Sequence, residues 1–99
     1  MISRQEYLFN EAEFNFWSFI RIEPRRWLEP TMADDIGGFW SVAVFGNKVL
    51  YYNEYEEGFN VSRYTSYGTI AEYHSNQNDL YDTVTVIYSG LAHEPYWTY

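Results

Sequence analysis

Apolar and aromatic positions are densest between residues 39 and 52, in two runs that flank Gly46-Asn47. β-Branched and aromatic residues favour strands, and a two-residue Gly-Asn loop between such runs is typical of a tight β-hairpin. This stretch therefore predicts a hairpin around which the rest of the chain is organised. The expected cross-strand pairs are Phe45–Lys48, Val44–Val49, Ala43–Leu50 and Val42–Tyr51.

Neither face of this hairpin is polar. Side chains alternate across a sheet, so one face is expected to carry Trp40, Val42, Val44, Val49 and Tyr51, and the other Phe39, Ala43, Phe45, Leu50 and Tyr52. An antiparallel hairpin with a solvated side would show one polar set. We therefore expect helices on one face. The other face is expected to be either concave and ligand-binding or closed by residues 24–35 or by a partner.

The N-terminal segment predicts one long helix. Ser3 and Glu6 have the spacing of a capping box, and Ile2 and Tyr7 that of a hydrophobic staple. The helix should end near Ile22, because proline at position 24 cannot continue it. Its apolar stripe is expected to be Leu8, Phe9, Ala12, Phe16, Phe19 and Ile20. Phe14 and Trp17 lie off that stripe, where they are either covered by a later segment or exposed to a partner.

Three further elements are expected between residues 24 and 73. Residues 25–29 predict a short helix after Pro24, with Trp27 and Leu28 facing inward. Residues 59–64 alternate and predict a third strand. In that strand Phe59 and Val61 share one face, and Asn60 and Ser62 the other. Residues 69–73 predict a short fourth strand at the sheet edge.

The C-terminal third predicts a second helix. Residues 76–79 are polar and suit a helix start, and apolar residues recur at helical spacing at Leu80, Val84, Ile87, Tyr88 and Leu91. Gly90 is expected to end it. Residues 83–88 also have the composition of a strand, but we favour the helix. The rings at Tyr96, Trp97 and Tyr99 predict that the tail docks on the domain or on a neighbour.

Together these elements predict a single α+β domain over residues 1–99. It would contain an N-terminal helix, a three- to four-stranded antiparallel meander and a C-terminal helix, with both helices packed on one sheet face. The hairpin and the segment after it, 52–60, resemble those of small bacterial proteins, and no motif within them carries a function.

The charge is uneven along the chain. The net charge is −8, and within residues 1–26 four arginines balance four glutamates, so the whole excess lies beyond residue 26. Such a field attracts basic partners and repels nucleic acid and anionic lipid, although solubility alone would also explain it. We therefore expect neither nucleic-acid nor membrane binding. No apolar run approaches the roughly 18 residues of a membrane span.

Motifs for catalysis are missing from the sequence. There is no cysteine, which excludes disulfides and thiolate zinc sites and fits a reducing, cytoplasmic setting. No nucleophile elbow, phosphate loop or dinucleotide-binding glycine pattern is present. Glu72, His74 and Asp79 have only weak metal-ligand spacing. We expect no enzyme activity, no cofactor and no metal site.

Three functions remain. The leading one is a non-catalytic interaction module for a basic protein, for instance an inhibitor of the immunity type. There, Glu54, Glu56 and Glu57 would steer the partner, and Phe14 and Trp17 would anchor it. The second is a binding domain for a sugar or planar ligand, with a pocket lined by Trp40, Tyr51, Tyr52 and Tyr64. The third is a homo-oligomer that associates through its aromatic surface.

Overall fold

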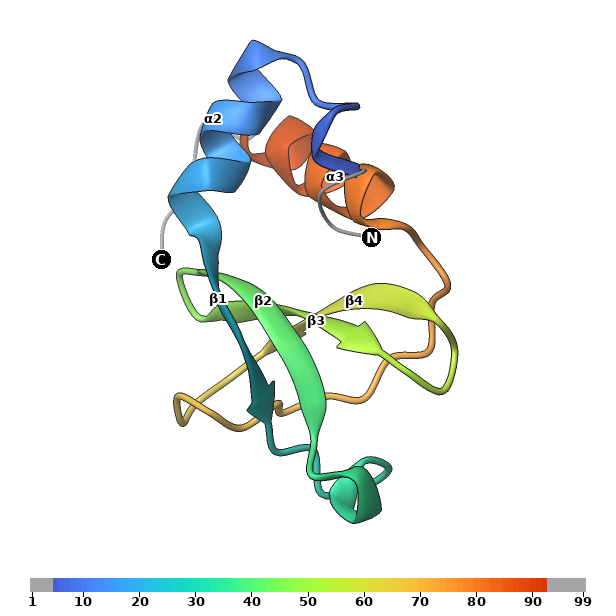
Figure 1. The fold of residues 1–99 in the computed structure, drawn as a ribbon. Coiled ribbons are helices and arrows are strands. Elements are labelled where there is room, and N and C mark those ends of the chain that lie inside the picture. Colours follow the sequence, from blue (N-terminus) through green and yellow to red (C-terminus); the bar gives the residue numbers. More distant parts are fainter. Residues whose placement is uncertain (1–4, 93–99) are drawn as a thin grey trace.

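The fold is α+β, as the sequence predicts. A computed structural model of the chain, which describes residues 5–92, shows one open sheet of four antiparallel strands in the order β1-β2-β3-β4. Two helices lie over one face of the sheet (Figure 1). In chain order the elements are α2 (Glu11–Ile20), β1 (Arg21–Trp27), a 3₁₀ turn (Asp34–Ile36), β2 (Phe39–Phe45), β3 (Lys48–Asn53), β4 (Gly58–Arg63) and α3 (Leu80–Ala92).

The predicted hairpin is confirmed, with its turn at Gly46-Asn47. Three of the expected pairs form: Phe45–Lys48, Val44–Val49 and Ala43–Leu50. The fourth prediction is wrong. The register shifts between Ser41 and Ala43, and Tyr51 pairs with Ser41 instead of Val42. A bulge of this kind places two residues of one strand opposite one of the other.

The bulge changes the two predicted faces. Val42 packs in the cluster beneath the helices together with Ala43, and Phe39 packs on the opposite side against Tyr51. Trp40 pairs with Tyr52. Because both faces are apolar, the alternation of the sequence does not penalise this local shift.

The N-terminal helix is interrupted, contrary to the prediction. Residues 5–6 are helical, the chain turns at 7–8, and α2 begins at Glu11. Asn10 caps this second start: its Oδ1 accepts the Glu13 N–H at 2.8 Å, and Glu13 Oε1 accepts the Asn10 N–H at 2.9 Å. A capping box is therefore present at 10–13. The predicted cap at Ser3 and the staple at Ile2 lie outside the described residues.

The interruption shifts the buried stripe of the helix. Trp17 and Ile20 are buried, whereas Leu8 and Phe19, both predicted to face the sheet, are 55% and 89% exposed. The prediction of one continuous wheel fails because the break at 7–10 resets the helical phase.

Residues 21–27 form a strand. The predictions that the first helix ends near Ile22 and that residues 25–29 form a short helix are therefore wrong. The chain passes directly from Ile20 at the end of α2 into β1, which pairs with β2. Pro24 is tolerated because β1 is an edge strand. Trp27 is buried as predicted, but Leu28 is 57% exposed because the helix expected to turn it inward does not form.

The third strand and the C-terminal helix are confirmed at Gly58–Arg63 and Leu80–Ala92. Residues 69–73 do not form the predicted strand, and β1 supplies the fourth strand instead; Thr69 makes only an isolated bridge to Leu28. Gly90 lies inside α3 and does not end it. The aromatic tail and the side chain of Leu91 lie outside what the structure describes.

Both faces of the sheet are covered. On the helix side the buried cluster contains Trp17, Ile20, Val42, Ala43, Phe45, Leu50, Phe59, Leu80 and Val84. On the other side it contains Trp27, Ala33, Phe39, Val49, Tyr51 and Ile70, with Ile36, Val44, Tyr64 and Tyr73 packed against it. That second face is closed by residues from the two long loops, 28–38 and 64–79, so the expected segment 24–35 covers only part of it. Neither helix that the structure describes is long and apolar enough to cross a membrane.

Candidate functional site

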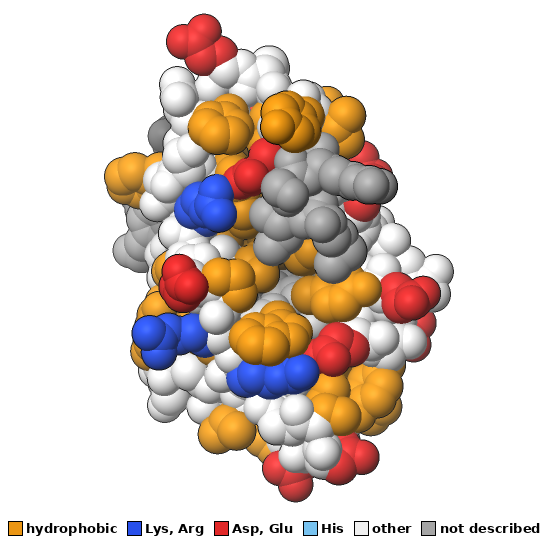
Figure 2. Space-filling view, viewed as in Figure 1, with side chains coloured by type: hydrophobic (Ala, Val, Ile, Leu, Met, Phe, Trp, Pro, Cys, Tyr) orange, Lys and Arg blue, Asp and Glu red, His pale blue; other side chains and the backbone are white. Residues whose placement is uncertain are grey.

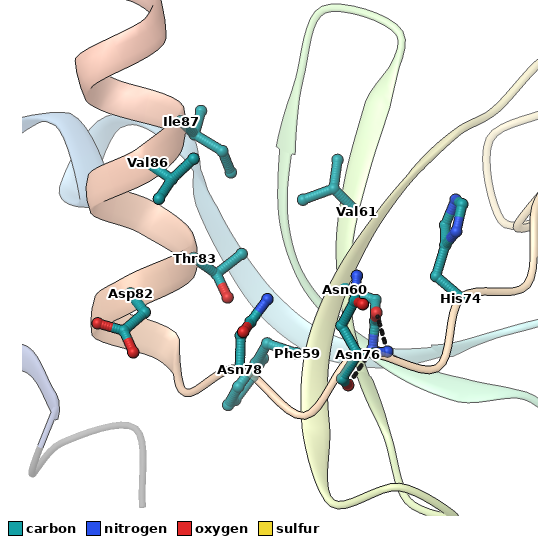
Figure 3. A pocket seen from close by; sticks show the side chains of 10 residues that line it. All are labelled: Phe59, Asn60, Val61, His74, Asn76, Asn78, Asp82, Thr83, Val86 and Ile87. Carbon is teal, nitrogen blue, oxygen red and sulfur yellow. Dashed lines mark hydrogen bonds between the residues drawn. The ribbon is translucent and has the colours of Figure 1, made fainter.

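A groove of about 290 Å³ lies between the edge of the sheet and the C-terminal helix. Figure 3 shows its parts: α3 on one side, β4 on the other, and the segment 76–78 as the floor. The apolar part of its lining comes from Phe59 and Val61 on β4 and from Val86 and Ile87 on α3. Asn60, whose side chain points to the opposite face of β4, also lines it. The groove therefore lies at the strand edge itself.

The floor of the groove is held firmly against β4. The Phe59 N–H donates to the Asn78 carbonyl at 2.8 Å. The Asn60 amide donates to the Asn76 carbonyl at 3.0 Å and accepts the Asn76 N–H at 2.9 Å. Gly58 is required here, because a Cβ on it would lie 2.4 Å from the Asn76 carbonyl oxygen.

One backbone position of β4 stays open to the groove. In a strand, alternate residues direct their N–H and C=O groups to the same edge. The backbone N–H and C=O groups of Phe59, Val61 and Arg63 therefore point outward from β4, away from β3. The Arg63 N–H donates to Glu72 Oε1 at 3.1 Å, and its carbonyl accepts the Ala71 N–H at 3.2 Å. Between these two fixed points, neither the N–H nor the C=O of Val61 has a hydrogen-bond partner among residues 5–92.

The gap exists because residues 73–75 leave the edge and pass beneath the sheet. There the His74 N–H donates to the Tyr51 hydroxyl at 2.7 Å, and the His74 carbonyl accepts from the Asn53 amide at 2.9 Å. Burial raises the pKa of Tyr51 to about 12. The phenol therefore stays protonated, and its hydroxyl can hold this loop away from the edge strand.

A second, smaller hollow adjoins the groove across the segment 76–79. It measures about 170 Å³ and shares Phe59 and Asn78 with the groove as lining residues. Glu57 and Asp79 also line it. Glu57 has a left-handed backbone, with φ of 54°, which a non-glycine residue adopts only at some cost.

Four carboxylates surround the two hollows, and we refer to them as the acidic rim: Glu56, Glu57, Asp79 and Asp82. Glu56 belongs to it through a 3.3 Å hydrogen bond from the Gln77 amide. Asp79 Oδ1 accepts the Asp82 N–H at 2.8 Å in the first turn of α3. Within the described part of the chain, none of the four forms an ion pair with lysine or arginine.

The rim contains two of the three glutamates expected to steer a partner. The third, Glu54, instead forms an ion pair with Arg26. Arg26 also donates to the Gly38 carbonyl at 2.8 Å and lies 4.7 Å from the centroid of the Trp40 ring. Glu54 is therefore ion-paired within the fold and is not counted in the rim.

The two expected aromatic anchors do not lie at the groove. Trp17 is 1% exposed, and its indole N–H donates to Glu6 Oε2 at 2.6 Å. Phe14 is 42% exposed on α2 and does not line either hollow. Trp17 thus contributes to the core in this conformation, and Phe14 remains a surface ring.

The four residues expected to line an aromatic pocket are divided between the two faces of the sheet. Tyr51 is fully buried and stacks on Phe39, with ring centroids 5.4 Å apart, and Tyr64 packs on the same side. Tyr52 packs against the helix-side cluster, and Trp40 is its cross-strand neighbour. The structure therefore does not bring these four rings into one pocket.

Metal-ligating side chains do not gather in the described residues, where no group of three His, Asp or Glu could hold an ion. The candidate pair Glu72 and His74 has 3.9 Å between Oε1 and Nε2. Glu72 instead accepts hydrogen bonds from Arg63, and these hold the pKa of its carboxyl below the usual value. His93, the other histidine, lies outside the described residues.

Arginines lie along the opposite edge of the sheet, where Arg21 and Arg26 pair with glutamates. The Lys and Arg side chains visible in Figure 2 lie over β1, which carries Arg21, Arg25 and Arg26. The acidic rim borders β4, the other edge strand. No family model, curated protein or solved structure matches the chain, so the groove and the charges around it carry the functional argument.

Sequence patterns did not mark Val61 or Asp82 as parts of a site, and they indicated Asp79 only as a weak metal ligand beside Glu72 and His74. The run 76–79 indicates a helix start with Asn76 as the cap, but α3 begins at Leu80 and Asp79 caps it instead. Only the folding of 76–79 against β4 brings the two aspartates beside Glu56 and Glu57.

Proposed function

We propose that this protein is a non-catalytic interaction module whose groove between β4 and α3 binds a basic segment of a protein partner. The observation that carries this is the acidic rim: four carboxylates without a cationic partner in residues 5–92, with Asp82 in the partly apolar groove, Glu57 and Asp79 in the smaller hollow beside it, and Glu56 hydrogen-bonded to Gln77. An inhibitor of the immunity type, which opposes a cationic surface, is one instance of this class.

The two kinds of surface have separate roles. Unpaired carboxylates accelerate the approach of a cationic partner and select against anionic ones. The apolar wall contributes affinity when a partner removes it from water; Val86 is 71% exposed and therefore has most of its side chain available for burial. Three other acids are already engaged within the fold. Glu54 and Glu72 are paired with arginines, and Glu29 is buried and accepts the Met32 N–H.

Selection of linear peptides from a random phage-displayed library tests this function. We expect peptides enriched in lysine and arginine, whose affinity falls as salt is added. The D82N/E57Q double variant should bind a selected peptide about tenfold more weakly, because each exposed charge pair contributes up to about 1 kcal/mol, and its binding should depend less on salt.

The matched control is E11Q/E23Q, which removes the same charge at exposed positions outside the groove. Its affinity should stay within about twofold of the parent chain, because distant surface charges are screened. Equal losses in the two double variants, or selected peptides without an excess of basic residues, would show that the rim does not select the partner.

A further inference from the structure

We propose that the partner segment binds in extended form, with one of its residues hydrogen-bonded to the backbone of Val61 and a neighbouring lysine or arginine beside Asp82. This assignment of the binding mode rests on the function proposed above. It follows from where the open backbone groups, the apolar wall and the rim lie relative to one another.

The edge of β4 can pair with about one residue of a partner. At Phe59 the outward N–H is already bonded to Asn78, and at Arg63 both outward groups are bonded to 71–72. Val61, between them, has its N–H and C=O open to the groove among the described residues. Strand addition at a sheet edge satisfies such groups and draws its affinity from main-chain hydrogen bonds. Because residues 71–72 and Asn78 already bond to the neighbouring positions of β4, strand addition here is confined to Val61.

The side chains around Val61 determine which partner side chains can lie beside the residue that pairs with Val61. Asp82 and Val86 are four residues apart on α3, and residues with this spacing lie on one face of a helix. Both line the groove. An extended chain at Val61 would bury Val86 and place a long cationic side chain within reach of the Asp82 carboxylate.

A second copy of this chain fits the groove poorly. Symmetric pairing of two β4 edges would bring two acidic rims together, and like charges repel. The edge strand β1 carries three arginines, but Arg21 and Arg26 already pair with glutamates, Pro24 lacks an N–H, and the pairing of β1 is irregular between Arg21 and Arg25. The structure therefore favours a different protein that offers a basic, extended segment.

The experiment uses a basic peptide selected on the full chain and methylates its backbone nitrogens one at a time. Because an N-methyl group cannot donate, methylation of the residue opposite Val61 should weaken binding about five- to tenfold, the effect of one lost hydrogen bond. The other central positions should change little. Hydrogen exchange of the Val61 amide should slow when the peptide binds.

A pair of variants tests the same contact from the protein side. V61P removes the backbone N–H at an edge position where proline is tolerated, and V61A keeps it while shortening the side chain. V61P should bind about five- to tenfold more weakly than V61A. The peptide methylation series does not depend on the folding of either variant.

The outcomes separate the two proposals. If binding depends on the rim but no methylated position loses affinity and Val61 exchange is unchanged, the strand mode is wrong and the function stands. If no basic peptide binds and Val61 becomes protected as the chain self-associates, a second copy occupies the groove and both proposals are overturned.

Discussion

At the residue scale, Tyr51 is the side chain on which the loop beneath the sheet depends. It is fully buried, and its hydroxyl accepts the His74 N–H at 2.7 Å. The Glu72 and His74 carbonyls lie 3.3 and 3.4 Å from the same oxygen. This single phenol therefore ties the loop to the central strand β3.

Replacing Tyr51 by phenylalanine should lower the free energy of unfolding by about 1–2 kcal/mol, because the His74 N–H loses its acceptor while the ring is kept. Urea denaturation of the parent chain and Y51F at neutral pH measures this. Y64F is a suitable control, since the Tyr64 hydroxyl bonds to the exposed Gly46 turn. A larger loss in Y64F than in Y51F would contradict the role given to Tyr51.

The same residue predicts a pH dependence. Burial raises the pKa of Tyr51 to about 12 from its ordinary value of 10.0, so the unfolded chain ionises first as pH rises. The stability that the parent chain derives from this group is complete below about pH 10 and is lost toward about pH 12. The advantage of the parent over Y51F should therefore shrink across that range in denaturation curves. An advantage that stays constant there would show that Tyr51 is not shielded.

Sequence reasoning at this scale identifies an acidic cluster because its residues are close together in the chain. Glu56 and Glu57 stand out as a dense acidic pair in the sequence. In the structure Glu57 lines the smaller hollow, and Glu56 accepts a hydrogen bond from Gln77, which lines the same hollow. Glu54 belongs to the same cluster in sequence, but its pairing with Arg26 depends on residues 21–27 being a strand, which no local pattern indicates.

At the element scale, the hairpin and β4 were predictable because alternation and turn chemistry occur within a few residues of each other. β1 was not predictable. Most of its residues are exposed, it contains a proline, and it exists because β2 offers an edge to pair with. The bulge at Ser41–Ala43 was equally hidden, because both faces of β2 are apolar.

Alanine substitutions at two glycines should change the stability of the fold in opposite directions. A Cβ on Gly58 would lie 2.4 Å from both the Asn76 carbonyl oxygen and the Gln77 Cα, whereas a Cβ on Gly90 in α3 meets nothing within 4 Å. G58A should destabilise the fold by about 1–3 kcal/mol, as overpacking does, and weaken peptide binding by displacing the groove floor.

G90A should instead raise stability by up to about 1 kcal/mol, the helix-propensity difference between glycine and alanine, with peptide binding unchanged. Thermal melts and peptide titrations of both variants measure these effects. Stabilisation by G58A would contradict the close approach of β4 to residues 76–77.

At the scale of the whole molecule, the arginines of β1 and the acidic rim beside β4 lie at opposite edges of the sheet. Residue counts indicate the excess of −8 but not this arrangement. This arrangement follows from the strand order, which places β1 and β4 at opposite edges of the sheet.

The unpaired acids predict a response to salt. Self-repulsion among like charges destabilises a compact state, and salt screens it. Raising sodium chloride from about 0.02 M to about 0.5 M should therefore raise the melting temperature, and D82N/E57Q should gain less than the parent. A melting temperature that falls with salt would mean that the arginine pairs outweigh the repulsion.

The direct junction between α2 and β1 has a mechanical consequence. Arg21 is both the C-cap of α2 and the first residue of β1, so no slack separates the helix from the strand. A load applied at the start of α2 passes to the β1–β2 hydrogen bonds without first stretching a linker. Under tension the N-terminal helix and the edge strand should detach together, in one step, and leave the three-stranded meander behind.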